Sequence, residues 1–356
     1  AGERSNLAVV NTGTQGSVTL RVVLRSGDGT STYEVPPALL PPLAPGEWRQ
    51  VNDSDLLKAA GFSDATALVS AVAGTAPWNA YAVFNDNLSN DGSFVPAVET
   101  EAASSDVVVP VVVETGSFES ELVLFNPSAS AVRARLSYTE SLAAPKGTVG
   151  SVTVELGPGA QVVLPQALDR LRSLGLPVGP RGAASYAGTL AVSFRTGLGT
   201  PVPGFAGAKT AAAGTGECEG KGSFGLFYTA LPASSGAVVA AFVDGLQQTA
   251  ATRSNLALWN PSSSVPVSVR YEVHDGATGA LAATSDPVDL PPLGWAQVDR
   301  VLAGAAVVTT RLGVSVSDVR KAVSMSQKPS IPALGAADTM SYFVCPHCSH
   351  ETEIFS

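Results

Sequence analysis

The residues best suited to chemistry lie near the end of the chain, where Cys345 and Cys348 are separated by Pro-His. Two thiolates at this spacing suit a tetrahedral metal ion or one half of an iron–sulfur cluster. A bridged cluster needs four thiolates and therefore two chains, whereas zinc would recruit His347 or His350 from the same chain. The competing interpretation is an exposed tail with two free thiols. Any metal is therefore expected at Cys345, Cys348, His347 and His350.

Two other segments contain ligand-type side chains, but a simpler interpretation is favoured for each. Cys218 lies between Glu217 and Glu219, and acidic neighbours disfavour the reactive thiolate. Residues 87–92 alternate oxygen-bearing side chains as in the start of a calcium loop, but Val98 stands where a bidentate Glu is needed. We expect an unreactive loop cysteine and a hairpin turn.

Hydrolytic chemistry has little support. His274 is the one histidine outside the C-terminal tail, in a Val-His-Asp-Gly turn, and the chain has no Gly-x-Ser-x-Gly elbow. Trp48, Trp259 and Trp295 recur on predicted strands, so we assign them to core packing, with a sugar-binding platform as the alternative. We therefore expect no catalytic residues and a protein that is not an enzyme.

The composition predicts a β-rich chain. Charged residues make up only 14% of the 356 residues, and 35 Gly and 25 Pro interrupt the sequence too often for long helices. Apolar runs such as 107–113 are too short to cross a bilayer. The net charge is -9 without a basic cluster, so nucleic acid is not an expected partner. The start at Ala1, without Met or an apolar signal core, suggests a processed product or a fragment.

Three windows of the sequence repeat one another. Each is a short apolar run that ends in Asn and is followed by turn formers, at residues 4–11, 119–126 and 253–260. A segment with period-two alternation follows each window, as in Val18, Leu20 and Val22. The pattern predicts a strand, a turn and a half-buried second strand in each repeat.

The similarity continues downstream of these windows. A glycine turn at Gly46, Gly159 and Gly294 leads into a short strand each time, and short helices are predicted at 53–60 and 166–174. We place repeat one at 1–100, repeat two at 106–233 and an incomplete repeat three at 234–302. Many short strands with regular turns favour tandem immunoglobulin-like antiparallel β-sandwich domains.

One strand is missing from repeat one. Apolar segments at 107–113 and 237–243 precede repeats two and three, yet repeat one begins almost directly at Arg4. A sandwich without this strand exposes unpaired backbone groups that recruit a strand from another chain. We expect this open edge near Leu7 to Val10, with self-association as its consequence.

Residues 1 to about 302, with these Asn-terminated strands and Pro-Gly turns, resemble tandem β-sandwich repeats of large secreted bacterial proteins. The resemblance implies a structural or adhesive protein at the bacterial cell surface. Its partners would be other surface proteins or further copies of itself, and it carries over no catalytic residues.

The tail has a different origin. Residues 340–348, Met-Ser-Tyr-Phe-Val-Cys-Pro-His-Cys, and more loosely the preceding forty, resemble the distal part of Mrp-type P-loop ATPases. In that family the Cys-x-x-Cys pairs of two subunits bridge one iron–sulfur cluster, which implies this role for Cys345 and Cys348 and a cytoplasmic location. The chain departs from the family because it has no Gly-x-x-x-x-Gly-Lys-Ser/Thr loop, and Arg311-Leu312 and Asp338-Thr339 replace Pro-Gln and Glu-Asn. The alternative function is thus a cluster or metal carrier at 303–356.

Overall fold

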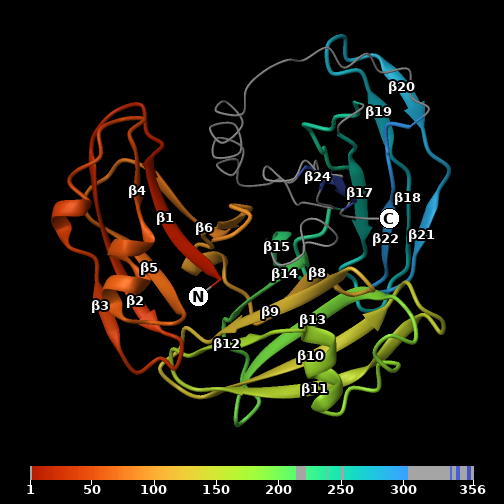
Figure 1. Cartoon of the computed structure of the whole chain (residues 1–356), viewed down its shortest axis with the longest axis horizontal. Coiled ribbons are helices and arrows are strands. Elements are labelled where there is room, and N and C mark those ends of the chain that lie inside the picture. Colours follow the sequence, from red (N-terminus) through yellow and green to blue (C-terminus); the bar gives the residue numbers. More distant parts are fainter. Residues whose placement is uncertain are drawn as a thin grey trace.

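The computed structural model describes residues 2–213, 222–237, 239–249 and 252–303, and the backbone of three short strands at 337–338, 342–344 and 351–353. The chain is mainly β and forms several antiparallel sheets. Figure 1 shows an open arc of three groups of strands, named here the N-terminal unit (β1 to β7), the central unit (β8 to β16) and the third unit (β17 to β22). No helix in the described part is long and apolar enough to cross a membrane.

Within the described ranges, helix is confined to short segments, as the glycine and proline content predicts. The α-helices α1 (Leu57–Ala60) and α2 (Ala167–Ser173) lie within the predicted ranges. Gly61, with a φ of 71°, ends α1 in the left-handed conformation that glycine adopts without strain. The 3-10 helices are η1 Pro37–Leu39, η2 Asp53–Asp55 and η3 Thr100–Ala102.

The N-terminal unit consists of two antiparallel sheets that share one core. Their strand orders are β4-β1-β6-β7 and β3-β2-β5. Alternate side chains of β2 are buried, and Val22 and Leu24 pack with Leu7 and Val9 of β1. The strands are β1 Glu3–Asn11, β2 Val18–Ser26, β3 Thr32–Glu34, β4 Trp48–Val51, β5 Ala65–Gly74, β6 Trp78–Asp86 and β7 Gly92–Pro96.

The central unit repeats this arrangement with two more strands, β8 and β16. Its strands follow the orders β11-β10-β13-β8 and β12-β9-β14-β15, which meet where β8 pairs with β9, and β16 pairs with β8. Leu122 and Leu124 of β9 pack with Tyr138 of β10 and with Leu168 and Leu171 of α2. The strands are β8 Asp106–Glu114, β9 Phe118–Phe125, β10 Val132–Glu140, β11 Gly147–Leu156, β12 Gln161–Leu164, β13 Tyr186–Thr196, β14 Phe205–Ala213, β15 Ser223–Thr229 and β16 Leu231–Pro232.

The third unit has smaller sheets, with pairs β22-β17, β18-β21 and β19-β20. Its core includes Leu256, Leu258, Val273 and Leu290. The tail reaches this unit, because β23 pairs with β17 on the side opposite β22, the place that β6 takes beside β1. The strands are β17 Asn255–Trp259, β18 Val267–Val269, β19 Glu272–His274, β20 Leu281–Thr284, β21 Val288–Leu290, β22 Trp295–Val298, β23 Ala337–Asp338, β24 Tyr342–Val344 and β25 Glu351–Glu353.

The asparagine that closes each repeated window has the same role in all three units. Asn11, Asn126 and Asn260 are buried at the ends of β1, β9 and β17. The Nδ2 group of each donates to a carbonyl in the turn that follows, 4 or 5 residues later, and to a carbonyl 30 to 32 residues later. Oδ1 of each accepts from the amide two residues later. The sequence repeat is therefore also a repeat of buried hydrogen bonds.

The missing strand leaves a different edge open from the one expected. Residues Leu7 to Val10 lie inside their sheet, because β1 pairs with both β4 and β6, so the predicted location is wrong. Strand β5 of the N-terminal unit corresponds to β13 of the central unit, since each follows the same order of strands in its sheet. β13 pairs with β10 on one side and with β8 on the other, whereas β5 pairs with β2 on one side and with no described strand on the other. The open edge therefore belongs to β5.

The predicted leading strand of the third unit is also wrong. The described residues of 237–243 belong to no strand, and Val239 and Phe242 are 95% and 89% exposed. In the central unit the corresponding strand β8 is held by β13. No strand in the described part of the third unit takes the place of β13, so the segment pairs with no described strand.

Core packing is the correct assignment for Trp259 but wrong for Trp48. Trp259 is 3% exposed, whereas Trp48 is 50% exposed. Alternation along β4 directs Val51 into the core and Trp48 to the outer face. There Trp48 donates from Nε1 to the Tyr81 hydroxyl at 2.9 Å. Trp295, at the corresponding position of β22, is half-buried because it packs against the central unit.

Candidate functional site

The four predicted metal ligands, Cys345, His347, Cys348 and His350, lie outside the described residues, as does Cys218. The backbone on both sides of the four ligands is described. Strands β24 and β25 form an antiparallel pair in which Val344 lies opposite Glu351. In the sequence, both cysteines fall between these two paired strands. Within the described residues, no group of three or more His, Cys, Asp or Glu side chains could hold a metal ion.

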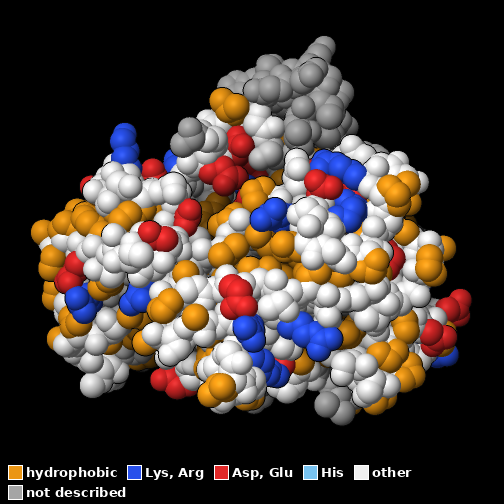
Figure 2. Space-filling model, turned by 90° about the horizontal axis from the view of Figure 1, so that it is seen from below, with side chains coloured by type: hydrophobic (Ala, Val, Ile, Leu, Met, Phe, Trp, Pro, Cys, Tyr) orange, Lys and Arg blue, Asp and Glu red, His pale blue; other side chains and the backbone are white. Residues whose placement is uncertain are grey.

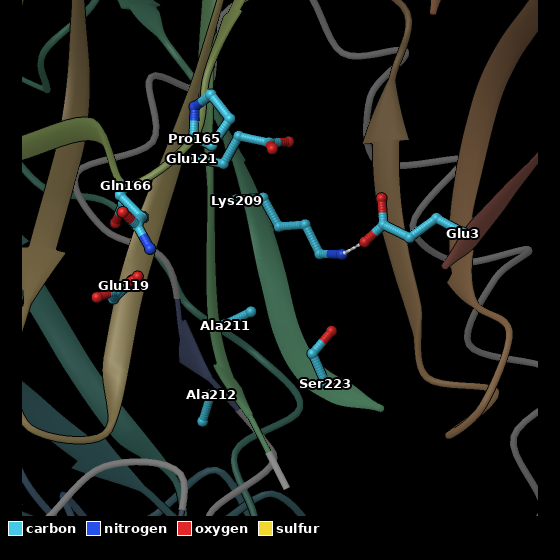
Figure 3. Close-up of a pocket in the computed structure, with 10 residues that line it drawn as sticks. Glu3, Glu119, Glu121, Pro165, Gln166, Lys209, Ala211, Ala212 and Ser223 are labelled. Atoms are coloured by element: carbon cyan, nitrogen blue, oxygen red, sulfur yellow. Dashed lines mark hydrogen bonds and ion pairs between the residues drawn. The ribbon is translucent and has the colours of Figure 1, made fainter. Parts of the chain in front are cut away.

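A cleft of about 220 Å³ lies where the N-terminal and central units meet. Glu3 of β1, Glu119 and Glu121 of β9, and Lys209 of β14 supply its charged lining. Figure 3 shows Lys209 extending toward Glu3, with which it forms an ion pair across the two units. Glu119 is paired with Arg181. The cleft is acidic, and its one lysine is already neutralised by Glu3.

The cleft shifts the pKa of Glu121. Burial raises the pKa of Glu121, the charge of Glu3 raises it further, and Lys209 opposes both. Ser120 is buried beside it and hydrogen-bonds the Val113 amide and the Thr210 hydroxyl. The residues that line the cleft include no histidine to activate this serine. The arrangement therefore serves to join two units, and sequence reasoning missed it because its residues are far apart in the chain.

The predicted hairpin turn at 87–92 is confirmed between β6 and β7, and its oxygens bind the neighbouring unit. Asp86 Oδ2 accepts from the amide and the hydroxyl of Ser223 at 3.1 Å, and Asp91 Oδ2 accepts from the Gly225 amide at 2.8 Å. In return, Ser89 and Ser93 donate to the carbonyls of Ser223 and Gly225. These contacts clamp the β6–β7 turn onto β15, so the oxygens that suggest a calcium loop are already occupied.

Asp86→Asn should weaken this clamp at neutral pH. Burial alone raises the pKa of Asp86, but hydrogen bonds from Ser89, Leu88 and Ser223 outweigh it and hold the pKa below its ordinary 3.8. The contribution of Asp86 is therefore complete above pH 3.8 and is lost as pH falls through its lower folded value. We expect a loss of about 2 kcal/mol in unfolding free energy at pH 7, since charged hydrogen bonds are involved.

Urea unfolding at pH 7 and in strong acid tests this expectation. The variant and the unsubstituted chain should converge as the pH falls below the folded pKa of Asp86. Asp28→Asn is the matched control, because Asp28 is hydrogen-bonded only within its own exposed turn in the described structure. Equal effects of the two substitutions at pH 7 would contradict the clamp.

His274 lies at the exposed end of β19, as expected of a turn histidine. Its Nε2 is 3.2 Å from the carboxylate of Glu272, and its Nδ1 is 3.3 Å from the Gly279 carbonyl. No serine or cysteine hydrogen bond to this ring is present in the described structure. The geometry gives His274 a local structural role.

Comparison with known proteins shows that one segment of the chain is similar to a family. Residues 288–356 match the ParA family description "NUBPL iron-transfer P-loop NTPase". The match begins at β21, upstream of the boundary at 303 expected from the sequence, and includes both cysteines. No solved structure matches the chain.

Curated relatives share the same C-terminal segment. The "Cytosolic Fe-S cluster assembly factor NUBP2 homolog" of Nematostella vectensis is 53% identical over 53 residues, which are 15% of this chain and 20% of the relative. The "Cytosolic Fe-S cluster assembly factor CFD1" of Kluyveromyces lactis is 45% identical over 64 residues, 18% of this chain and 21% of the relative. The chain spans about one fifth of the length of the curated relatives it matches.

Proposed function

We propose that the chain binds an iron–sulfur cluster through Cys345 and Cys348, with the three β units as its scaffold. The observation that carries the proposal is the match of residues 288–356, which contain both cysteines, to an iron-transfer family. Relatives of this segment are named as cytosolic Fe–S cluster assembly factors. In this function the cluster is cargo, and the location is cytoplasmic.

The donor set suits a cluster better than a hard cation, because thiolates select iron–sulfur clusters and zinc. In the sequence, the two cysteines fall between the paired strands β24 and β25. Two thiolates supply half of the ligands of a cluster, so a second copy must supply the others. Zinc bound with His347 or His350 is the competing occupant and would need one chain only.

Nucleotide hydrolysis is not part of this proposal. The printed sequence contains no Gly-x-x-x-x-Gly-Lys-Ser/Thr loop, whose backbone amides, lysine and hydroxyl are needed to hold phosphates and Mg²⁺. We propose a carrier that is not an enzyme. Binding and release of the cluster would then depend on the protein that receives it.

A second function is favoured by the repeated units. The buried asparagines Asn11, Asn126 and Asn260 support three related domains, at 1–100, 106–233 and 234–302, which we propose to be immunoglobulin-like sandwiches. Without a cluster, such an array would be a structural or adhesive protein of the bacterial cell surface. Other surface proteins or further copies would then be its partners.

Cys345→Ala with Cys348→Ala should abolish metal binding, whereas Cys218→Ala, the matched control, should not. The expectation follows because the two tail thiolates are the proposed ligands and Cys218 is not. Anaerobic purification followed by iron and sulfide determination and visible absorption measures it. Iron content that is unchanged by the double substitution, or no iron in the unsubstituted chain, would contradict the cluster and leave the structural function.

A further inference from the structure

The open edge of β5 is unusually receptive to another strand. β5 (Ala65–Gly74) contains no charged residue, although edge strands normally carry charges or proline that prevent pairing with other chains. Leu68 and Val72 are 59% and 58% exposed. Along the corresponding strand β13, which β8 covers, most residues are buried. β5 therefore has the uncharged composition of a central strand, although it is an edge strand.

The third unit contains an apolar segment that pairs with no described strand. Residues 239–243, Val-Ala-Ala-Phe-Val, precede the third repeat as β8 precedes the second, and they contain no charge. They lie outside any sheet, with Val239 and Phe242 almost fully exposed. Within the described ranges, β5 is thus an edge without a partner strand, and residues 239–243 are an apolar segment without a partner edge.

We propose that residues 239–243 of one copy add as an antiparallel strand to the open edge of β5 in a second copy. The strand takes the place that β8 holds beside β13, so the backbone groups of β5 become paired. Because side chains alternate along a strand, Val239 and Phe242 then lie on opposite faces of the extended sheet, and one of them becomes a neighbour of the exposed Leu68. Figure 1 shows the N-terminal and third units at opposite ends of the arc, which suits a contact between copies.

The geometry of such a contact is head to tail. Donor and acceptor are different surfaces, so each copy keeps a free edge at one end and a free strand at the other. A heterologous contact of this kind continues into chains or closes into rings. The inference is independent of the cluster, because neither surface includes the cysteines.

Two variants separate the donor from the acceptor. The acceptor variant, Leu68→Lys with Val72→Lys, places charges along the β5 edge. The donor variant, Val239→Pro with Phe242→Lys, removes one backbone donor and one apolar contact from residues 239–243. All four side chains are exposed, so each variant should fold, which circular dichroism verifies. Leu198→Lys is the control, since Leu198 is 98% exposed and lies outside both surfaces.

Sedimentation equilibrium should be measured on the full chain carrying Cys345→Ala and Cys348→Ala, so that a bridged cluster cannot contribute. That chain and its Leu198→Lys form should associate beyond a dimer as concentration rises. Each two-site variant should remain a single chain, yet an equimolar mixture of the two should form a dimer and nothing larger. A parent chain that stays monomeric, variants that still associate, or a mixture that gives no dimer would each overturn the proposal.

Discussion

Asn126→Ala should lower the unfolding free energy by about 3 kcal/mol, because it removes several buried hydrogen bonds and leaves their backbone partners unsatisfied. Nδ2 of Asn126 donates to the carbonyls of Ser130 and Gly157 at 2.8 Å and of Leu156 at 3.3 Å. Its Oδ1 accepts from the Ser128 amide at 2.9 Å. The side chain is fully buried, so water cannot replace it.

Asn126→Asp is a sharper form of the same test. The carboxylate keeps the shape of the amide but turns an oxygen toward three carbonyl oxygens that need a donor. At pH 7 this variant should be at least as unstable as Asn126→Ala. Denaturant unfolding measures both, and the control is Asn52→Ala, because Asn52 is exposed on the N-terminal unit. An Asp variant as stable as the unsubstituted chain would contradict the assigned hydrogen bonds.

Arg172→Ala should cost about 3 kcal/mol of stability, since it leaves a buried carboxylate without its partner. Arg172 of α2 contacts both oxygens of Glu114 at 2.6 and 3.0 Å, and its Nε donates to the Gly179 carbonyl at 2.7 Å. Side-chain exposure is only 15% for Arg172 and 7% for Glu114. The hydrogen bond to Glu114 is the main cause of the raised pKa of Arg172, so Arg172 stays charged.

Arg170→Ala on the same helix is the matched control and should change stability little, because Arg170 is exposed. Adding Glu114→Ala to Arg172→Ala should recover part of the loss, since no isolated charge then remains buried. Thermal and denaturant unfolding of the single and double variants give the coupling. Equal losses for Arg170→Ala and Arg172→Ala would contradict the importance of the buried pair.

Local pattern was sufficient for the repeated windows and the short helices. The windows at 4–11, 119–126 and 253–260 become β1, β9 and β17, and α1 and α2 lie within the ranges predicted for them. The pattern could not reveal why each window ends in Asn. That reason lies in carbonyls about thirty residues away in sequence, such as Leu43 and Leu156.

Positions that depend on pairing between distant strands were predicted less well. The sequence indicated that repeat one lacks its first strand. It did not indicate that this strand would have paired with β5, because only the sheet order shows that β5 corresponds to β13. Trp48 and Trp295 share a repeat position, yet their burial differs because a neighbouring unit covers only Trp295. The contacts of Asp86 with Ser223 likewise depend on how two units meet.

Native mass spectrometry of the anaerobically reconstituted chain tests the cluster proposal most directly. The acceptor variant Leu68→Lys, Val72→Lys should be used, so that strand addition does not contribute to the mass. Four thiolates from two copies predict a species of two chains with one iron–sulfur cluster, which dissociates to single chains when the cluster is removed. A single chain that carries one zinc ion, or a chain that takes up no metal, would contradict the account.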